Sequence, residues 1–147
     1  MDDKSLWALP ARFPKKRASS GPRKQPERSL QIRVATMLTW MLPPEVPWTA
    51  IGHGGGGERR GQILKRMGVK PGWMDIILVF RGRFIGIELK SGTYLSEPQK
   101  LVHTQIVAAG GVVRVCKSEE EVVEFLEVLG VPLNPVRLSP ADRASGF

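Results

Sequence analysis

Residues 75–90 read DIILVFRGRFIGIELK and carry the clearest structural pattern in the chain. Two runs rich in β-branched and aromatic residues flank a central Arg-Gly pair, which predicts two antiparallel strands joined by a tight turn. Arg-Gly is a weaker turn signal than Asn-Gly, so the two-residue loop is an assumption. With that loop, Phe80 faces Arg83 and, counting outward, Asp75 faces Glu88. One face of the hairpin then carries four large apolar side chains suited to the core, those of Ile76, Leu78, Ile85 and Ile87.

The other face of the predicted hairpin brings together two carboxylates and a lysine. Opposed residues of an antiparallel pair have β-carbons about 5 Å apart, so Asp75 and Glu88 would be neighbours. Lys90 lies two residues beyond Glu88 and points to the same face. Facing like charges destabilise a hairpin unless something neutralises them, and Mg²⁺ commonly binds one or two carboxylates together with water and phosphate. The alternative is an acid–lysine ion pair on an exposed sheet face.

The remaining sequence predicts one α/β domain at residues 26–130. Apolar spacing and the capping boxes at 96–99 and 118–121 predict helices at 26–41, 58–67, 97–109 and 119–129. Strands are expected at 46–51, 75–80, 84–90 and 112–116. This order predicts a three-layer α/β/α domain with a mixed central sheet. Residues 1–25 are expected to form a basic, disordered arm, and residues 131–147 a loose C-terminal tail.

Charge indicates the partner. The 147 residues contain 22 lysines and arginines against 14 acidic residues, a formal net charge of +8 with a pI of about 10.2, so polyanions are natural partners. One basic segment holds Arg59, Arg60, Lys65, Arg66 and Lys70, which would bind backbone phosphates without reading sequence. The alternative for these residues is a solvated helix face. Residues 119–127, by contrast, hold five glutamates and no basic residue, which suggests a second face turned to solvent.

Other bulk features exclude several classes of protein. No apolar run approaches the roughly 18 residues of a membrane span, and the first 20 residues lack the apolar core of a secretory signal. The single cysteine, Cys116, permits no internal disulfide and fits a reducing compartment. A cytoplasmic location is therefore expected, and a compact, free-standing chain of this kind would suit a bacterial or phage-infected cell.

The residues of the hairpin also carry a family resemblance. Asp75 followed by Glu88-Leu89-Lys90 resembles the PD-(D/E)XK nuclease motif. The wider stretch resembles the VRR-NUC family of that superfamily, in GVKPG at 68–72, IELK at 87–90 and LSEPQ at 95–99. The resemblance runs from about residue 26 to residue 130.

This resemblance implies a restriction-endonuclease-like fold that hydrolyses phosphodiester bonds with Mg²⁺, for which Mn²⁺ can substitute. It also implies that the backbone carbonyl of Leu89 joins Asp75 and Glu88 as a metal ligand. Family members that consist of little beyond the nuclease domain are homodimers that act on branched DNA. The resemblance therefore implies a homodimer and a branched or Holliday-junction DNA substrate. One position departs from the pattern, because Met74 stands where the family usually has proline. Proline there supplies no ligand atom, so we expect the change to affect geometry rather than chemistry.

Five further residues have both a functional and a structural interpretation. Glu27 could approach the metal, or it could only favour the helix dipole in the first turn. Gln99 could touch the scissile phosphate or the lysine, and it also closes a capping box. His53 could contact DNA from a glycine-rich loop, although a mobile loop over the site is the alternative. Trp73 could stack on a splayed base or pack in the core. His103 is expected to face solvent or the core rather than a metal.

The expected function is that of a Mg²⁺-dependent DNA endonuclease that recognises DNA structure more than DNA sequence. Its catalytic residues would be Asp75, Glu88 and Lys90, assisted by Glu27 and Gln99. Two alternatives stay open. The first is a DNA-binding or assembly module that keeps the fold without catalysis, and the second is a nuclease that acts on RNA.

Overall fold

The computed structural model describes residues 26–52, 57–92 and 94–135. The predictions for the arm at 1–25, for His53 and for most of the C-terminal tail lie outside the described residues. The elements, in chain order, are α1 (Pro26–Met41), β1 (Trp48–Ala50), α2 (Gly57–Arg66), β2 (Ile76–Phe80), β3 (Arg83–Leu89), α3 (Glu97–Ala108), β4 (Val112–Cys116) and α4 (Glu119–Val128). Every element expected from the sequence is present, with ends that agree within two residues.

The four strands form one mixed sheet in the order β1-β2-β3-β4. The first three strands are antiparallel neighbours, whereas β3 and β4 run parallel. Parallel neighbours need a long crossover connection, and α3 supplies it. The predicted mixed sheet is therefore confirmed.

The register of the β2–β3 hairpin is the predicted one. Phe80 pairs with Arg83 and Ile76 pairs with Ile87. Arg81 and Gly82 both adopt positive φ angles, of 49° and 71°, as a two-residue turn of type I′ requires. The turn therefore forms without the preferred Asn-Gly pair. All four side chains of the predicted apolar face are at most 1% exposed.

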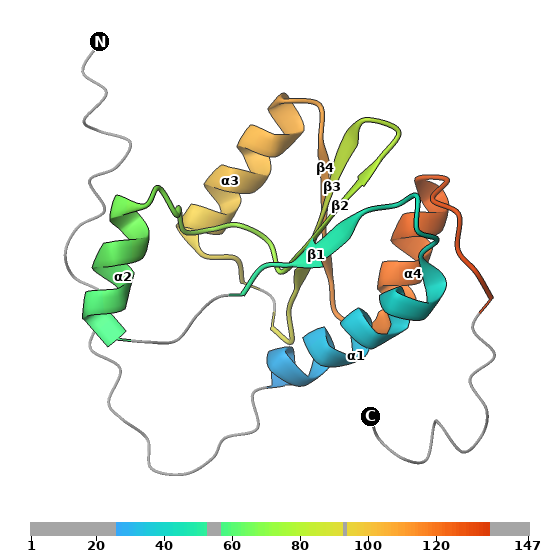
Figure 1. Ribbon diagram of the computed structural model, residues 1–147, viewed down its shortest axis with the longest axis horizontal. Helices are drawn as coiled ribbons and strands as arrows, with labels where there is room; N and C mark the ends of the chain where they lie inside the picture. The colour runs from blue at the N-terminus through green and yellow to red at the C-terminus, as the bar shows by residue number, and fades with distance from the viewer. Residues whose placement is uncertain (1–25, 53–56, 93, 136–147) are drawn as a thin grey trace.

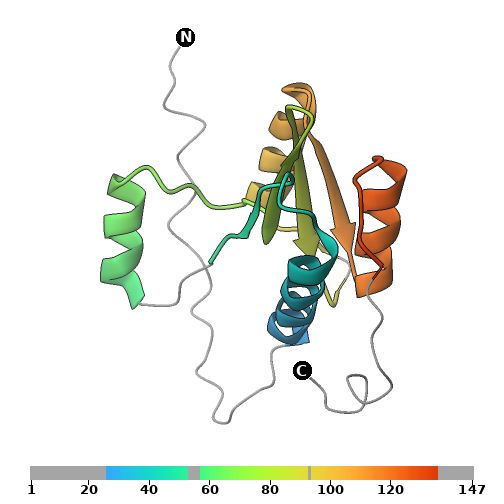
Figure 2. The ribbon, with the colours of Figure 1, turned by 45° about the vertical axis from the view of Figure 1, so that its right-hand side comes forward.

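Helices cover both faces of the sheet, as Figures 1 and 2 show, with α1 and α4 on one side and α3 on the other. The helices α1 and α4 supply six buried side chains to the core, those of Leu30, Val34, Leu38, Val122, Phe125 and Leu126. Each such side chain contributes about 1.5–3 kcal/mol on burial. These contacts fix α1 and α4 against the apolar face of the hairpin.

Helix α2 differs from the other three, because none of its residues is buried. It lies apart from the sheet in both ribbon views (Figure 2). Gly68 follows it with a φ of 88°, as expected of a left-handed cap. No helix among the described residues is long and apolar enough to cross a membrane.

The two predicted capping boxes have different outcomes. At the start of α3 both arms of the box are present, because Ser96 accepts from the amide of Gln99 and the Gln99 side chain accepts from the amide of Ser96. At α4 only one arm forms, in which the Ser118 hydroxyl accepts from the amide of Glu121 at 3.2 Å. The prediction of a second full box is wrong, since the Glu121 carboxylate instead accepts from the amide of Lys117 at 2.8 Å. That amide needs an acceptor where the chain leaves β4.

Candidate active site

Two carboxylates lie across the hairpin on the face that α3 covers. Glu88 belongs to β3 and is 1% exposed. Asp75 directly precedes β2 and is half-buried. Its Oδ2 accepts a hydrogen bond from the backbone amide of Leu89 at 2.7 Å, which ties the side chain to the end of β3. The strand ladder begins one pair later, at Ile76 and Ile87, so Asp75 lies at the end of the hairpin beside Glu88, bonded to the amide of Leu89.

Two close contacts hold the segment that delivers Asp75. Met74 is fully buried, and a β-carbon at Gly86 would lie 2.9 Å from its Cγ, so the glycine makes room for the methionine. Gly72 has a φ of 91°, and a β-carbon there would lie 2.3 Å from the carbonyl oxygen of Pro98. The loop before β2 is therefore packed both on the sheet and on the first turn of α3. Met74 therefore serves as a packing anchor for this loop.

Glu88 is the hub of the polar cluster. Its Oε1 accepts from the Gln99 side-chain amide at 2.5 Å, and the Lys90 ammonium lies 3.5 Å from the same oxygen. Gln99 thus serves the capping box and the cluster at once. The other oxygen, Oε2, is buried and has no hydrogen-bond partner among the described residues, although His103 Nε2 lies 3.9 Å away.

The electrostatics of the cluster favour a proton or a cation at Glu88. Burial raises the pKa of Glu88 from 4.5 to about 7, and the negative charge of Asp75 adds to this rise. Lys90 opposes it, and a smaller contribution from Glu27 again raises the pKa. Burial and the nearby Lys90 charge lower the pKa of His103. Ionised Glu88 is therefore under-neutralised by its protein neighbours.

Helix α1 brings a third acid to the edge of this cluster. Glu27 lies in the first turn of α1, and its Oε1 accepts from the amide and the hydroxyl of Ser91, at 3.4 and 3.5 Å. Ser91 directly follows Lys90. The structure thus places Glu27 beside the end of β3, close enough to act electrostatically on Glu88.

The donor set fits a hydrated divalent cation better than a fully protein-enclosed metal. Within residues 26–52, 57–92 and 94–135, no group of three or more His, Cys, Asp or Glu side chains could hold a metal ion. Mg²⁺ needs no such group, because it usually keeps several waters and binds one or two carboxylates. In the part of the chain that the structure describes, Oε2 of Glu88 is a buried carboxylate oxygen without a hydrogen-bond partner, and a cation or an ordered water would satisfy it. The role of the Leu89 carbonyl stays a prediction.

The predicted DNA-binding residues fall into two groups. The basic side chains of α2 and the following loop are exposed, namely Arg59, Arg60, Lys65, Arg66 and Lys70. Trp73 is half-buried and packs edge-to-face on Phe84, with ring centroids 6.1 Å apart. That contact satisfies the packing interpretation of Trp73, and base stacking stays a prediction.

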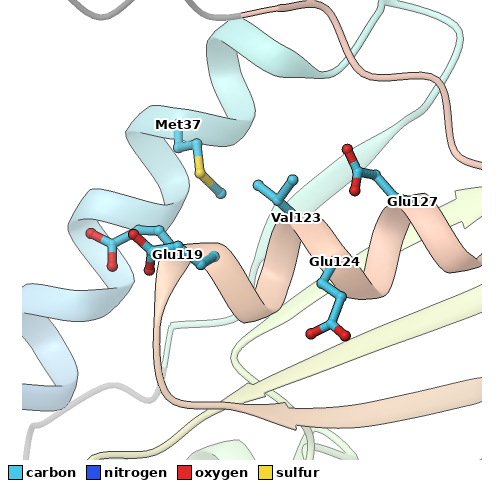
Figure 3. A pocket seen from close by; sticks show the side chains of 6 residues that line it. Met37, Glu119, Val123, Glu124 and Glu127 are labelled. Carbon is cyan, nitrogen blue, oxygen red and sulfur yellow. The ribbon is translucent and has the colours of Figure 1, made fainter.

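The opposite side of the sheet carries an acidic groove of about 340 Å³ between α1 and α4. Figure 3 shows Met37 of α1 and Val123 of α4 within it and glutamates along α4. Its acidic lining residues are Glu119, Glu120, Glu124 and Glu127. Two of them are neutralised by ion pairs, Glu119 with Arg33 and Glu124 with Arg114. The groove thus gathers four of the five glutamates of residues 119–127 on the side of the sheet away from Glu88.

His103 is the residue of this site that the sequence interpretation missed. Solvent or the core is the expectation for His103, and its side chain is indeed only 14% exposed, but the contact of this side chain with the Glu88 carboxylate was not predicted. The signal was its spacing, because residues four apart on a helix share one face and His103 follows Gln99 by four.

Comparisons with protein-family models, with curated proteins and with solved structures find no match to this chain. The site therefore rests on its own geometry.

Proposed function

We propose that this protein is a Mg²⁺-dependent endonuclease of the restriction-endonuclease-like fold, which hydrolyses phosphodiester bonds in DNA. The observation that supports the proposal is the cluster of Asp75, Glu88 and Lys90 on one face of the hairpin. A mixed sheet between helices is also what the resemblance to the VRR-NUC family implies. In this cluster, Asp75 and Glu88 are suited to bind a divalent cation, and the Lys90 ammonium is suited to contact a phosphate.

Asp75 and Glu88 are the residues that would hold the cation, with Leu89 offering its carbonyl and Glu27 acting directly or through water. A bound divalent cation lowers the pKa of water, polarises a phosphoryl oxygen and stabilises a leaving oxyanion. The raised pKa of Glu88 supports this assignment, because a buried carboxylate near a second acid is stabilised by added positive charge. Asp75, in turn, is oriented by the Leu89 amide.

Lys90 would act on the substrate itself. Hydrolysis forms a bond from a water oxygen to phosphorus, while the bond to one ester oxygen breaks and that oxygen takes up a proton. The Lys90 side chain is 17% exposed, so its ammonium is shielded yet reachable from solvent. A compact cation in this position orients the attacking water and stabilises the charge that develops on the phosphoryl oxygens. Gln99 donates a hydrogen bond to the Glu88 carboxylate, and orienting Glu88 in this way requires no contact between Gln99 and the phosphate.

The substrate class follows from charge and from the resemblance. The net charge of +8 and the exposed basic residues of α2 favour a nucleic acid. Branched or Holliday-junction DNA, a homodimer and a cytoplasmic setting are the finer parts of the proposal, and the family resemblance carries them. Phosphate contacts position a nucleic acid without specifying its shape.

Cleavage assays with four substrates test the proposal. The full chain is incubated with duplex DNA, a four-way DNA junction, single-stranded DNA and RNA, in Mg²⁺, in Mn²⁺ and in EDTA. We expect metal-dependent cleavage of DNA, fastest on the junction. Asp75→Asn should lower the rate at least about a hundredfold while junction binding survives, since loss even of residues that only orient metal ligands costs 10–100-fold. Glu127→Gln, an exposed acid on the opposite side, is the matched control.

Each contrary outcome has a meaning. Cleavage by Asp75→Asn at the parental rate would refute the active-site assignment. Junction binding without metal-dependent cleavage of any substrate would favour the non-catalytic DNA-binding module. Faster cleavage of RNA than of DNA would change the proposed substrate to RNA and leave the active-site assignment intact.

A further inference from the structure

Two buried polar atoms face each other at the proposed metal site, and neither has a hydrogen-bond partner among the described residues. They are Oε2 of Glu88 and Nε2 of His103, 3.9 Å apart. Their side chains are only 2% and 14% exposed. Native proteins satisfy nearly all buried polar groups, so an orphaned pair at this separation indicates an interaction that tightens or takes in a small bridging species.

Packing fixes the position of His103 from both ends of α3. The capping box and the contact of Pro98 with Gly72 anchor the first turn. At the other end, a β-carbon at Gly111 would lie 2.6 Å from the Ile106 side chain, so the helix meets the start of β4 closely. His103 lies between these anchors, one helical turn beyond Gln99. Its placement against Glu88 therefore follows from the crossover itself.

The partners of Glu88 divide between its two oxygens. Gln99 and Lys90 both approach Oε1. His103 is the side chain that approaches Oε2. A carboxylate held through one oxygen can still rotate about its Cγ–Cδ bond. A donor on the second oxygen would fix the plane of the carboxylate, and Oε2 would keep a second lone-pair site for a cation.

We propose that His103 is a positioning residue for Glu88, whose Nε2–H donates to Oε2 directly or through one water and so orients the carboxylate for a divalent cation. This inference rests on the proposed function. It requires no particular charge on the ring, since Nε2 can carry a proton in the neutral and in the cationic imidazole. Hydrogen-bond donors that orient ligating carboxylates contribute 10–100-fold to metal affinity or activity in known sites.

Calorimetric titration of the full chain with Mn²⁺ tests the inference. His103→Leu introduces an apolar side chain that fills much of the same volume but has no hydrogen-bond donor. His103→Gln keeps an N–H donor. We expect Mn²⁺ to bind H103L about 10–100-fold more weakly than the parent, and H103Q to recover most of the loss. Gln105→Ala, an exposed residue on the same helix, is the control and should bind as the parent does. Cleavage kinetics should show a lower kcat for H103L with an unchanged KM, because His103 is not proposed to touch DNA.

The outcomes separate this inference from the function on which it rests. Parental Mn²⁺ affinity in H103L, with binding lost in Asp75→Asn, would overturn the role of His103 and leave the metal site intact. A parent chain that binds no Mn²⁺ would overturn both. If H103L does not fold, a structure of the Mn²⁺-loaded parent decides instead. A direct or single-water contact between Nε2 and Oε2 supports the proposal, and an imidazole turned away from Glu88 contradicts it.

Discussion

Replacing Glu88 by glutamine should change the pH dependence of stability in the metal-free protein. The folded chain holds the proton of Glu88 more tightly than the unfolded chain, because burial and the charge of Asp75 raise its pKa from 4.5 to about 7. Such a group contributes stability that is fully present below about pH 4.5 and is lost as the pH rises through about 7. The glutamine side chain does not titrate, so Glu88→Gln removes this loss.

The expected size follows from the shift. At about 1.4 kcal/mol per pKa unit, a rise from 4.5 to about 7 corresponds to about 3–4 kcal/mol in total. Most of it, about 2 kcal/mol or more, should develop between about pH 5 and pH 8. The interaction with Lys90 is already part of this shift, whereas the difference in packing and hydrogen bonding between glutamine and protonated glutamate adds an offset that does not vary with pH. The informative quantity is therefore the change with pH in the difference between the two free energies of unfolding.

Urea unfolding in EDTA at several pH values measures this difference. The free energy of unfolding of Glu88→Gln should gain on that of the parent as the pH rises. Glu127→Gln reports how much of the trend comes from removing an exposed glutamate. A difference between Glu88→Gln and the parent that stays constant from pH 5 to pH 8 would refute the reasoning, because Glu88 would then have an ordinary pKa in the folded protein.

Four further predictions concern the surroundings of the site and the basic helix. Gly72→Ala should lower the free energy of unfolding by at least about 2 kcal/mol, since it combines a φ of 91° with a clash against the Pro98 carbonyl, and an unchanged urea midpoint would contradict this. Gly86→Ala should cost about 1–3 kcal/mol through Met74, and a double-mutant cycle with Met74→Ala should show coupling, whereas strict additivity would argue against the contact. Cys116 should resist thiol reagents until the protein unfolds, because its side chain is fully buried and burial raises the pKa of the thiol to about 11. Fast labelling of Cys116 in the native protein would contradict this prediction. The double change Arg59→Gln and Arg60→Gln should weaken DNA binding and reduce the slope of log K against log salt by about 2, and an unaltered slope would remove α2 from the interface.

The hairpin could be predicted from sequence because one constraint settled it. Placing Ile76 and Ile87 on the same buried face leaves a single register, and a slip by one residue would expose every apolar side chain of a strand. The same register places Asp75 near Glu88, so the central part of the site followed from hydrophobic patterning. The turn at Arg81 was the weakest step, and its positive φ was unexpected for an arginine.

The rest of the site depended on tertiary packing that local patterns do not contain. His103 reaches Glu88 only because α3 crosses the sheet in a particular direction. Met74, in the segment before β2, fills the space above Gly86 of β3, and neither residue signals this complementarity alone. Glu121 bonds to Lys117 because of where β4 ends, and the sequence pattern of a capping box does not specify that end.

A crystal structure of the protein with Mn²⁺ and a four-way DNA junction tests the central claim most directly. The account predicts Mn²⁺ bound by the carboxylates of Asp75 and Glu88, at metal–oxygen distances near the 2.0–2.2 Å expected of such ions, with a phosphate of the DNA beside Lys90. Mn²⁺ bound elsewhere, or a DNA backbone that passes over the acidic groove of α4, would contradict it.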